Sequence, residues 1–115
     1  MKGSVLMTTT NNLQYKDIKK CYKAWSKREK IVSKSSSGGI FYEVAKNILS
    51  EDGVIFGVVF QENGTVQFEK AETEGEVVGL MGSKYIQAKA NYVYSSVKKY
   101  LVEGHKVLFC GTPCQ

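Results

Sequence analysis

The sequence lacks an apolar run long enough to cross a membrane, and this excludes a membrane-spanning helix as its organising feature. Its longest apolar segment, Gly53 to Phe60, has the length of a buried strand. The first residues, Met1 to Met7, carry one lysine and too short an apolar stretch for a secretory signal peptide. We therefore expect a cytoplasmic protein without a membrane partner.

Cysteine and histidine are also scarce, with three cysteines and one histidine. An odd number of cysteines without a secretory signal argues against a disulfide framework. Cys110 and Cys114 are separated by three residues, which matches neither a thioredoxin motif nor a zinc knuckle, and Cys21 is distant from both. His105 has no cysteine or carboxylate nearby in sequence, which favours a surface role. We expect no metal site from this chain alone.

What is present is an ordinary globular composition with an excess of positive charge. The 115 residues suffice for one domain, 43% are hydrophobic, and the formal net charge is +5. Many cations lie between Lys16 and Lys34, interleaved with aromatic residues, a mixture that can bind nucleic acid. Because no nucleic-acid motif accompanies the charge, we favour a solvated basic face and expect no nucleic-acid partner. A positive field that attracts an anionic cofactor is a third interpretation.

Hydrophobic periodicity predicts helices and strands in alternation. Residues 1–19 contain a run of Thr and Asn and are expected to form a loose N-terminal segment, followed by a domain over residues 20–115. Within it we expect helices over about 40–49, within 71–81 and over 91–103, strands over 20–25, 54–60, 65–69 and 106–110, a hairpin turn at 62–64, and a loop over 26–34. This order predicts an α/β (α+β) fold, a mixed β-sheet with helices packed on it.

The C-terminal segment looks like the start of another helix. Gly111-Thr112-Pro113 follows an apolar strand, and proline suits the first position of a helix. The sequence ends at Gln115, so we expect a single incomplete domain with apolar surface left uncovered. The simplest remedy is a homodimer that buries the region from Val107 to Gln115.

Three segments are candidates for chemistry. The first is Ser35-Ser36-Ser37-Gly38-Gly39, a turn that opens a helix. Backbone amides and the positive end of a helix dipole bind phosphate well, and glycine lets a ligand approach the backbone. The same residues also suit a helix start capped by serine, and the pattern alone leaves both interpretations open.

The second and third candidates follow later in the chain. In Gly82-Ser83-Lys84-Tyr85 a lysine can pair with phosphate and a tyrosine can stack on a flat ring, although an ordinary surface loop has the same composition. Gly111-Thr112-Pro113-Cys114-Gln115 follows a strand, where open α/β sheets place ligands. Cys114 would lie at a helix start that favours its thiolate, whereas Cys110 continues an apolar run and is expected in the core.

These segments together resemble a known family. The sequences SSSGGIF at 35–41, GVIFG at 53–57, GSKYIQ at 82–87 and VLFCGTPCQ at 107–115 occur in this order. The combination is similar to the N-terminal domain of the coenzyme F420 hydrogenase/dehydrogenase beta-subunit family and covers about residues 20–115.

The resemblance implies an oxidoreductase that binds FAD and 4Fe-4S clusters and passes electrons between them and a deazaflavin or another acceptor. It also implies a redox partner protein, or a C-terminal domain that this sequence lacks. Cofactor-binding roles carry over to Ser36, Ser37, Gly38, Gly39, Ser83, Lys84 and Thr112, and a catalytic role carries over to Cys114. Whether Cys114 contacts flavin or ligates a cluster stays open.

The sequence departs from the family in one respect that matters for cofactors. Relatives carry closely spaced cysteines before this domain, whereas here only Cys21 precedes Cys110. The resemblance therefore implies FAD in full-length relatives but no 4Fe-4S cluster in this chain alone. The alternative function is a catalytically inactive domain that folds and self-associates.

Overall fold

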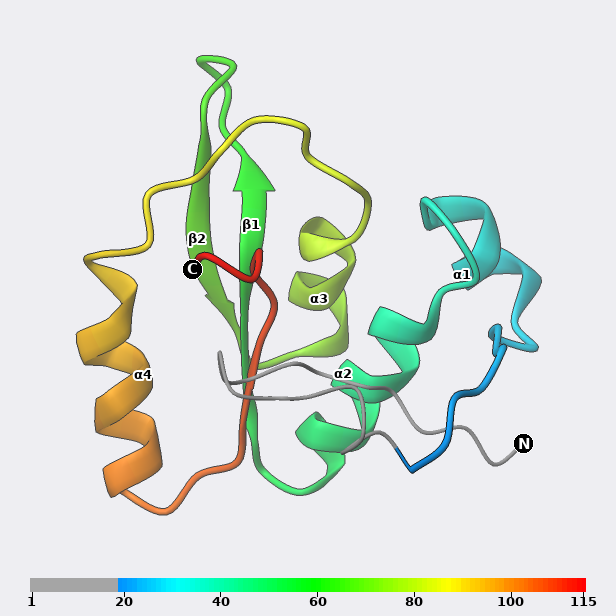
Figure 1. The fold of residues 1–115 in the computed structure, drawn as a ribbon, viewed down its shortest axis with the longest axis horizontal. Helices are drawn as coiled ribbons and strands as arrows, with labels where there is room; N and C mark the ends of the chain where they lie inside the picture. The colour runs from blue at the N-terminus through cyan, green and yellow to red at the C-terminus, as the bar shows by residue number, and fades with distance from the viewer. Residues whose placement is uncertain (1–18) are drawn as a thin grey trace.

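The computed structural model describes residues 19–115, so most of the N-terminal segment predicted over residues 1–19 lies outside the described residues. Four helices and three strands follow one another along the chain (Figure 1). They are α1 (Glu29–Lys34), α2 (Ile40–Ser50), β1 (Val54–Phe60), β2 (Val66–Ala71), α3 (Glu74–Leu80), α4 (Val93–Val102) and β3 (Val107–Phe109). The mixed sheet with helices packed on it confirms the predicted α/β fold.

The sheet has the strand order β2-β1-β3. β1 and β2 form an antiparallel hairpin in which Phe60 pairs with Val66 and Ile55 pairs with Ala71. β1 and β3 are parallel, and Phe56 pairs with Phe109. β3 therefore lies at an edge of the sheet formed by residues 19–115.

Helices cover both faces of the sheet, with α4 on one side and α2 and α3 on the other (Figure 1). The cause is the alternation of side chains along β1. Ile55 packs into the cluster formed with α2 and α3, while Val54 and Phe56 pack into the cluster formed with α4. Because both faces are buried, β1 is a continuous apolar run, as its sequence predicts.

Two sequence-based predictions at the start of the domain are wrong. The strand expected over residues 20–25 is irregular, because most of its side chains are exposed and find no sheet to pack against. The loop expected over residues 26–34 contains α1, a helix without a buried residue. Its apolar pair, Ile31 and Val32, is too small a signal for a helical pattern.

The ends of α4 are close to their predicted positions. Gly104 follows the helix with φ +86°, a left-handed conformation that glycine adopts readily. Val93, Val97 and Tyr100 pack on the sheet, whereas Leu101 is exposed. None of the helices within residues 19–115 is long and apolar enough to cross a bilayer.

Candidate functional site

The serine–glycine turn, residues 35–39, connects α1 to α2, but its serines do not cap α2. The N-cap is Gly39, whose left-handed conformation (φ +79°) starts the helix without a side-chain hydrogen bond. The Ser35 hydroxyl instead donates to the carbonyl oxygen of Ile31 at 2.6 Å. Of the two interpretations of this turn, the serine-capped helix start is therefore excluded, and no serine hydroxyl of this turn caps α2.

The two glycines of this turn are packed against the protein itself. A Cβ atom on Gly38 would lie 2.9 Å from the Trp25 Cβ, and one on Gly39 would lie 3.0 Å from the Ile31 Cγ2. The amide of Ser26 also donates to the Gly38 carbonyl oxygen at 2.7 Å. Internal packing is thus sufficient to require glycine at both positions, and their binding roles stay predictions.

The first turn of α2 leaves amides open for an anion. The Glu43 amide bonds to the Gly39 carbonyl oxygen, but the amides of Ile40, Phe41 and Tyr42 have no acceptor within residues 19–115. Such amides, together with the positive end of the helix dipole, attract negative charge. This property was predicted from the sequence pattern and does not depend on serine caps.

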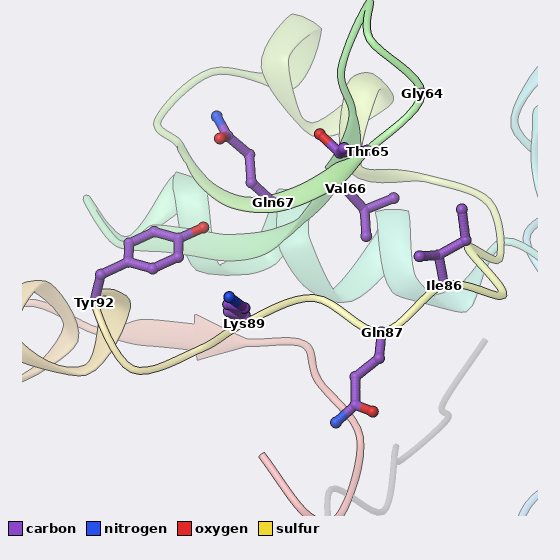
Figure 2. Close-up of a pocket in the computed structure, with 8 residues that line it drawn as sticks. All are labelled: Gly64, Thr65, Val66, Gln67, Ile86, Gln87, Lys89 and Tyr92. Carbon is purple, nitrogen blue, oxygen red and sulfur yellow. The ribbon is translucent and has the colours of Figure 1, made fainter.

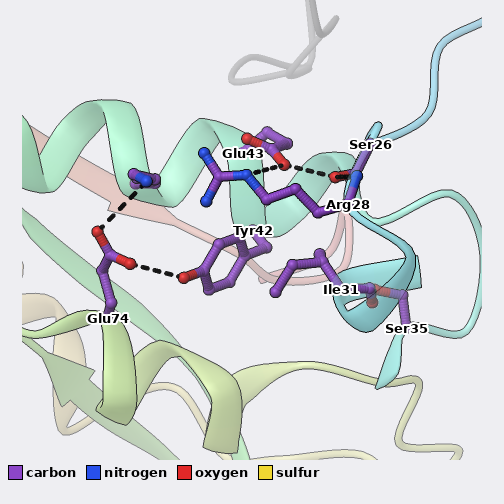
Figure 3. Close-up of polar contacts among 8 residues, drawn as sticks. Ser26, Arg28, Ile31, Ser35, Tyr42, Glu43 and Glu74 are labelled. Carbon is purple, nitrogen blue, oxygen red and sulfur yellow. Dashed lines mark hydrogen bonds and ion pairs between the residues drawn. The ribbon is translucent and has the colours of Figure 1, made fainter. Parts of the chain in front are cut away.

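Side chains on α2 tie the helix to its surroundings (Figure 3). The buried Ser26 hydroxyl donates to Glu43 Oε1 at 2.5 Å, and Arg28 Nε lies 3.6 Å from the same oxygen. The Tyr42 hydroxyl donates to Glu74 Oε2 at 2.8 Å. This hydrogen bond raises the pKa of Tyr42 and lowers the pKa of Glu74. The start of α2 is therefore fixed to the preceding segment and to α3.

The loop at residues 82–85 contacts the serine–glycine turn directly. The Ser83 amide donates to the Ser36 hydroxyl oxygen at 2.6 Å, across 47 residues of sequence. Gly82 precedes this contact with φ +86°. The first and second candidate segments, separate in the sequence, thus form one surface.

Lys84 is committed to the end of α3. Its Nζ donates to the carbonyl oxygens of Leu80 and Met81 at 2.9 and 2.6 Å. Partial burial lowers its pKa, because desolvation disfavours the charged form. Two of its three donors satisfy free carbonyls at the helix end, so Lys84 holds the loop in position and retains one donor for a ligand.

The third candidate segment follows β3 in a set of turns. The Thr112 Oγ1 lies 3.1 Å from the Cys114 Sγ, and the Thr112 amide donates to the Gln115 Oε1 at 3.0 Å. Gln115 Nε2 then donates to the Ala88 carbonyl oxygen at 2.7 Å. Gln115 thereby joins this segment to the segment that follows the Lys84 loop.

Cys110 corrects another expectation. It was predicted in the core, but the residue is exposed, although its amide still donates to the Phe56 carbonyl oxygen of β1 at 2.9 Å. Enough protein still surrounds its thiol for desolvation to raise the pKa, and the nearby positive charge of Lys84 opposes that rise. Its exposed surface leaves the thiol accessible to reagents.

The other cysteines give no metal site among the residues the structure describes. Cys21 and Cys114 are exposed free thiols. Over residues 19–115, no three side chains of His, Cys, Asp or Glu come together in a group that could hold a metal ion. A 4Fe-4S cluster with four cysteine ligands does not fit the side chains present here.

A groove not predicted from the sequence lies on the outer edge of β2 (Figure 2). It has a volume of about 390 Å³ and contains none of the predicted site residues. At one end the Tyr92 hydroxyl accepts a hydrogen bond from the Phe68 amide at 2.7 Å and lies 3.2 Å from the Phe68 carbonyl oxygen. The remaining lining residues are Gly64, Thr65, Val66, Gln67, Ile86, Gln87 and Lys89.

Comparison with known proteins gives one result. The family model described as "Coenzyme F420 hydrogenase/dehydrogenase, beta subunit N-term" matches residues 21–105, which is most of the chain. The match covers the serine–glycine turn and the Lys84 loop and stops before Thr112 and Cys114. No curated protein matches the chain.

Proposed function

The chain belongs to the coenzyme F420 hydrogenase/dehydrogenase beta-subunit family, and from this premise we propose that it contributes the phosphate-side and flavin-side loops of an FAD-dependent oxidoreductase. The observation that carries the proposal is the 2.6 Å hydrogen bond from the Ser83 amide to the Ser36 hydroxyl. It joins two loops of phosphate-binding composition beside the open amides of α2.

FAD fits the groups available at this surface. The amides of Ile40, Phe41 and Tyr42 offer donors to its diphosphate, and the Ser37 hydroxyl and the third donor of Lys84 lie on the same pair of loops. Bound FAD supplies hydride and single-electron chemistry. The chain's own part is to bind the diphosphate and to hold the serine–glycine turn and the Lys84 loop in position beside the flavin ring. The roles proposed for Thr112 and Cys114 rest on the family resemblance, and the Thr112 segment is joined through Gln115 to Ala88, which follows the Lys84 loop.

The iron–sulfur part of the proposed electron path belongs outside residues 19–115. Three exposed and separate thiols fall short of the four ligands that a 4Fe-4S cluster takes. We therefore assign the cluster to a redox partner protein or to a further domain, in keeping with a family of subunits.

The partner surface has a competing assignment, a homodimer that buries the region from Val107 to Gln115. β3 is an edge strand among the described residues, and strand edges pair readily. Sedimentation at micromolar concentration combined with thiol labelling separates the two. A dimer that shields Cys114 supports the homodimer, whereas a monomer with a reactive Cys114 leaves this edge to another protein.

The proposed function is tested by FAD binding to the purified chain. We expect FAD to bind weakly and ADP to compete, because both carry the diphosphate. Ser36→Ala should weaken FAD binding about fivefold, the value of one ordinary hydrogen bond of about 1 kcal/mol. Ser33→Ala is the matched control, since the Ser33 hydroxyl bonds only within α1, to Lys30.

Two results would contradict the proposal. One is a folded chain that shows no FAD binding at millimolar cofactor. The other is FAD binding to which ADP is indifferent, because such binding would not use the diphosphate. Unchanged affinity in Ser36→Ala would show that the contact between the two loops does not contribute to FAD binding. The amides of α2 would then be the binding groups.

A further inference from the structure

Tyr85 is the most exposed of the large hydrophobic side chains in the part of the chain that the structure describes. Its exposed fraction is 96%, against 57% for Phe60 and 54% for Trp25. An aromatic ring left in water forgoes a large burial gain, and tyrosine rings of this kind are frequent where proteins bind other molecules. Tyr85 lies in the loop that contacts the serine–glycine turn through Ser83.

The backbone on both sides of Tyr85 is held in place. Before it, the Ser83 amide bonds to Ser36, and Lys84 Nζ bonds to two carbonyls at the end of α3. After it, Ala88 is buried and its carbonyl oxygen accepts the 2.7 Å bond from Gln115. The ring is therefore solvated although its loop is anchored, so a ligand would meet a platform whose backbone is already ordered.

Tyr85 is also close to the proposed phosphate site. It lies two residues after Ser83, a separation of at most about 7 Å along the backbone, and Ser83 touches the serine–glycine turn. The residue between them, Lys84, carries the only side-chain cation of residues 82–88. A ligand with a diphosphate at α2 and a planar ring one step beyond would meet open amides, a cation and an aromatic face in turn.

We propose that Tyr85 stacks on a planar ring of FAD. This inference rests on the proposed function, because it takes the diphosphate to lie at the start of α2. A ring is favoured over a further phosphate because an aromatic face attracts flat π-systems and offers nothing to an anion. Both the flavin and the adenine of FAD have this chemistry, and experiment distinguishes them.

The test compares Tyr85→Leu, which removes the ring, with Tyr85→Phe, which keeps it. Affinities for FAD, FMN and ADP are measured, together with the fluorescence of bound flavin, which a stacked aromatic ring quenches. We expect Tyr85→Leu to weaken FAD binding about three- to tenfold, the effect of one aromatic pair, and Tyr85→Phe to bind as the parent chain does. Phe60→Leu, at an exposed ring elsewhere on the surface, should change nothing.

The ligand series identifies the ring. A loss for FMN with brighter bound flavin assigns the flavin ring to Tyr85, and a loss for ADP without a fluorescence change assigns the adenine. If the parent chain binds FAD and Tyr85→Leu binds it equally well, the inference is overturned while the proposed function stands. If the parent chain does not bind FAD, both are overturned. Unchanged urea midpoints for the variants exclude a folding defect as the cause.

Discussion

The two faces of the sheet are built from different kinds of side chain. The face covered by α2 and α3 has a mostly aliphatic core with two alanines, and Gly57 on this face has Leu80 so close that a Cβ would lie 3.3 Å from it. The face covered by α4 is aromatic, and the Phe68 and Phe109 rings stack with centroids 5.0 Å apart. Both clusters contain two alanines, so the difference lies in the larger side chains, which are mainly branched aliphatic beneath α2 and α3 and mainly rings beneath α4.

The difference matters for the candidate site. The serine–glycine turn leads into α2, and the Lys84 loop leaves α3, so both depend on the close packing of the aliphatic face. Its buried members are Tyr42, Ala45, Ile55, Ala71, Val77, Leu80 and Leu108. No predicted binding residue lies on α4 or β2. The aliphatic face therefore positions the turn before α2 and the start of the Lys84 loop, while the aromatic cluster holds Ala88, where that loop ends and Gln115 bonds.

The largest expected effect comes from Phe68→Ala on the aromatic face. Phe68 is 3% exposed, and removing its ring should cost about 3–5 kcal/mol in free energy of unfolding. Urea unfolding followed by circular dichroism measures the loss, with Phe68→Leu as a milder variant if alanine prevents folding. The exposed Phe60→Ala is the control and should stay within about 0.5 kcal/mol of the parent.

The same experiment tests whether the two faces of the sheet unfold together. Trp25 packs beside Gly38 at the start of α2, so its fluorescence reports on the aliphatic side. If the sheet joins both faces into one cooperative unit, fluorescence and circular dichroism transitions coincide in the parent and the variant. Separate transitions would show that each face unfolds on its own.

Much of this architecture could be predicted from local sequence. The apolar run Val54 to Phe60 is β1 with the predicted bounds, and the Asn63-Gly64 turn joins it to β2 as expected. The helical spacing after Gly39 gives α2, and Gly104 ends the segment that contains α4. In each case the period of the hydrophobic residues, or a residue suited to a turn, locates the ends of the element to within a few residues.

The errors come from interactions that distant parts of the chain decide. The Ser36 hydroxyl accepts from the Ser83 amide, 47 residues away, rather than capping α2. A serine next to a helix start looks the same in sequence whether it caps the helix or contacts another loop. Cys110 continues an apolar run and its amide still bonds β1, yet the residue is exposed, because which segments cover a sheet edge is decided by the tertiary fold.

A smaller effect is expected for Tyr92→Phe, where α4 meets the free edge of β2. On the outer edge of β2, the Tyr92 hydroxyl accepts a hydrogen bond from the Phe68 amide and donates one to the Phe68 carbonyl oxygen. Since Tyr92 is 53% exposed, water can replace part of these bonds, and the loss should be about 1 kcal/mol in free energy of unfolding. Tyr22→Phe, at a similarly exposed ring, is the control.

The Tyr92 result also bears on the comparison of the faces. The substitution keeps the ring, so the aromatic packing should persist while the edge of β2 is opened. Faster hydrogen exchange at the Phe68 amide, with unchanged exchange in α2, is the expected pattern. Equal acceleration in both places would contradict the assignment of this bond to one side of the sheet.

The smallest effect concerns the start of α3 and appears as a dependence on pH. Thr73 and Glu76 form a capping box, in which the Glu76 carboxylate accepts from the amides of Glu72 and Thr73 at 2.8 and 3.1 Å. The Glu72 amide is the main cause that lowers the pKa of Glu76 below its ordinary value of 4.5. A carboxyl group whose pKa is lower in the folded state stabilises the fold above its unfolded pKa, and this contribution is lost as pH falls through the folded pKa.

Glu76→Gln keeps the shape of the cap and removes its charge, so the parent should be more stable than the variant at pH 7, and the difference should disappear as pH falls through the lowered folded-state pKa of Glu76. The measurement is the urea midpoint of each protein at pH 7, 5, 4 and 3. Both retain the Tyr42–Glu74 bond, so its own loss in acid cancels in the difference. Glu62→Gln, in the exposed hairpin turn, should follow the parent at every pH. A difference between Glu76→Gln and the parent that stays constant with pH would mean that the amide side chain merely bonds less well, and that the charge of Glu76 has no part in holding α3 on the aliphatic face.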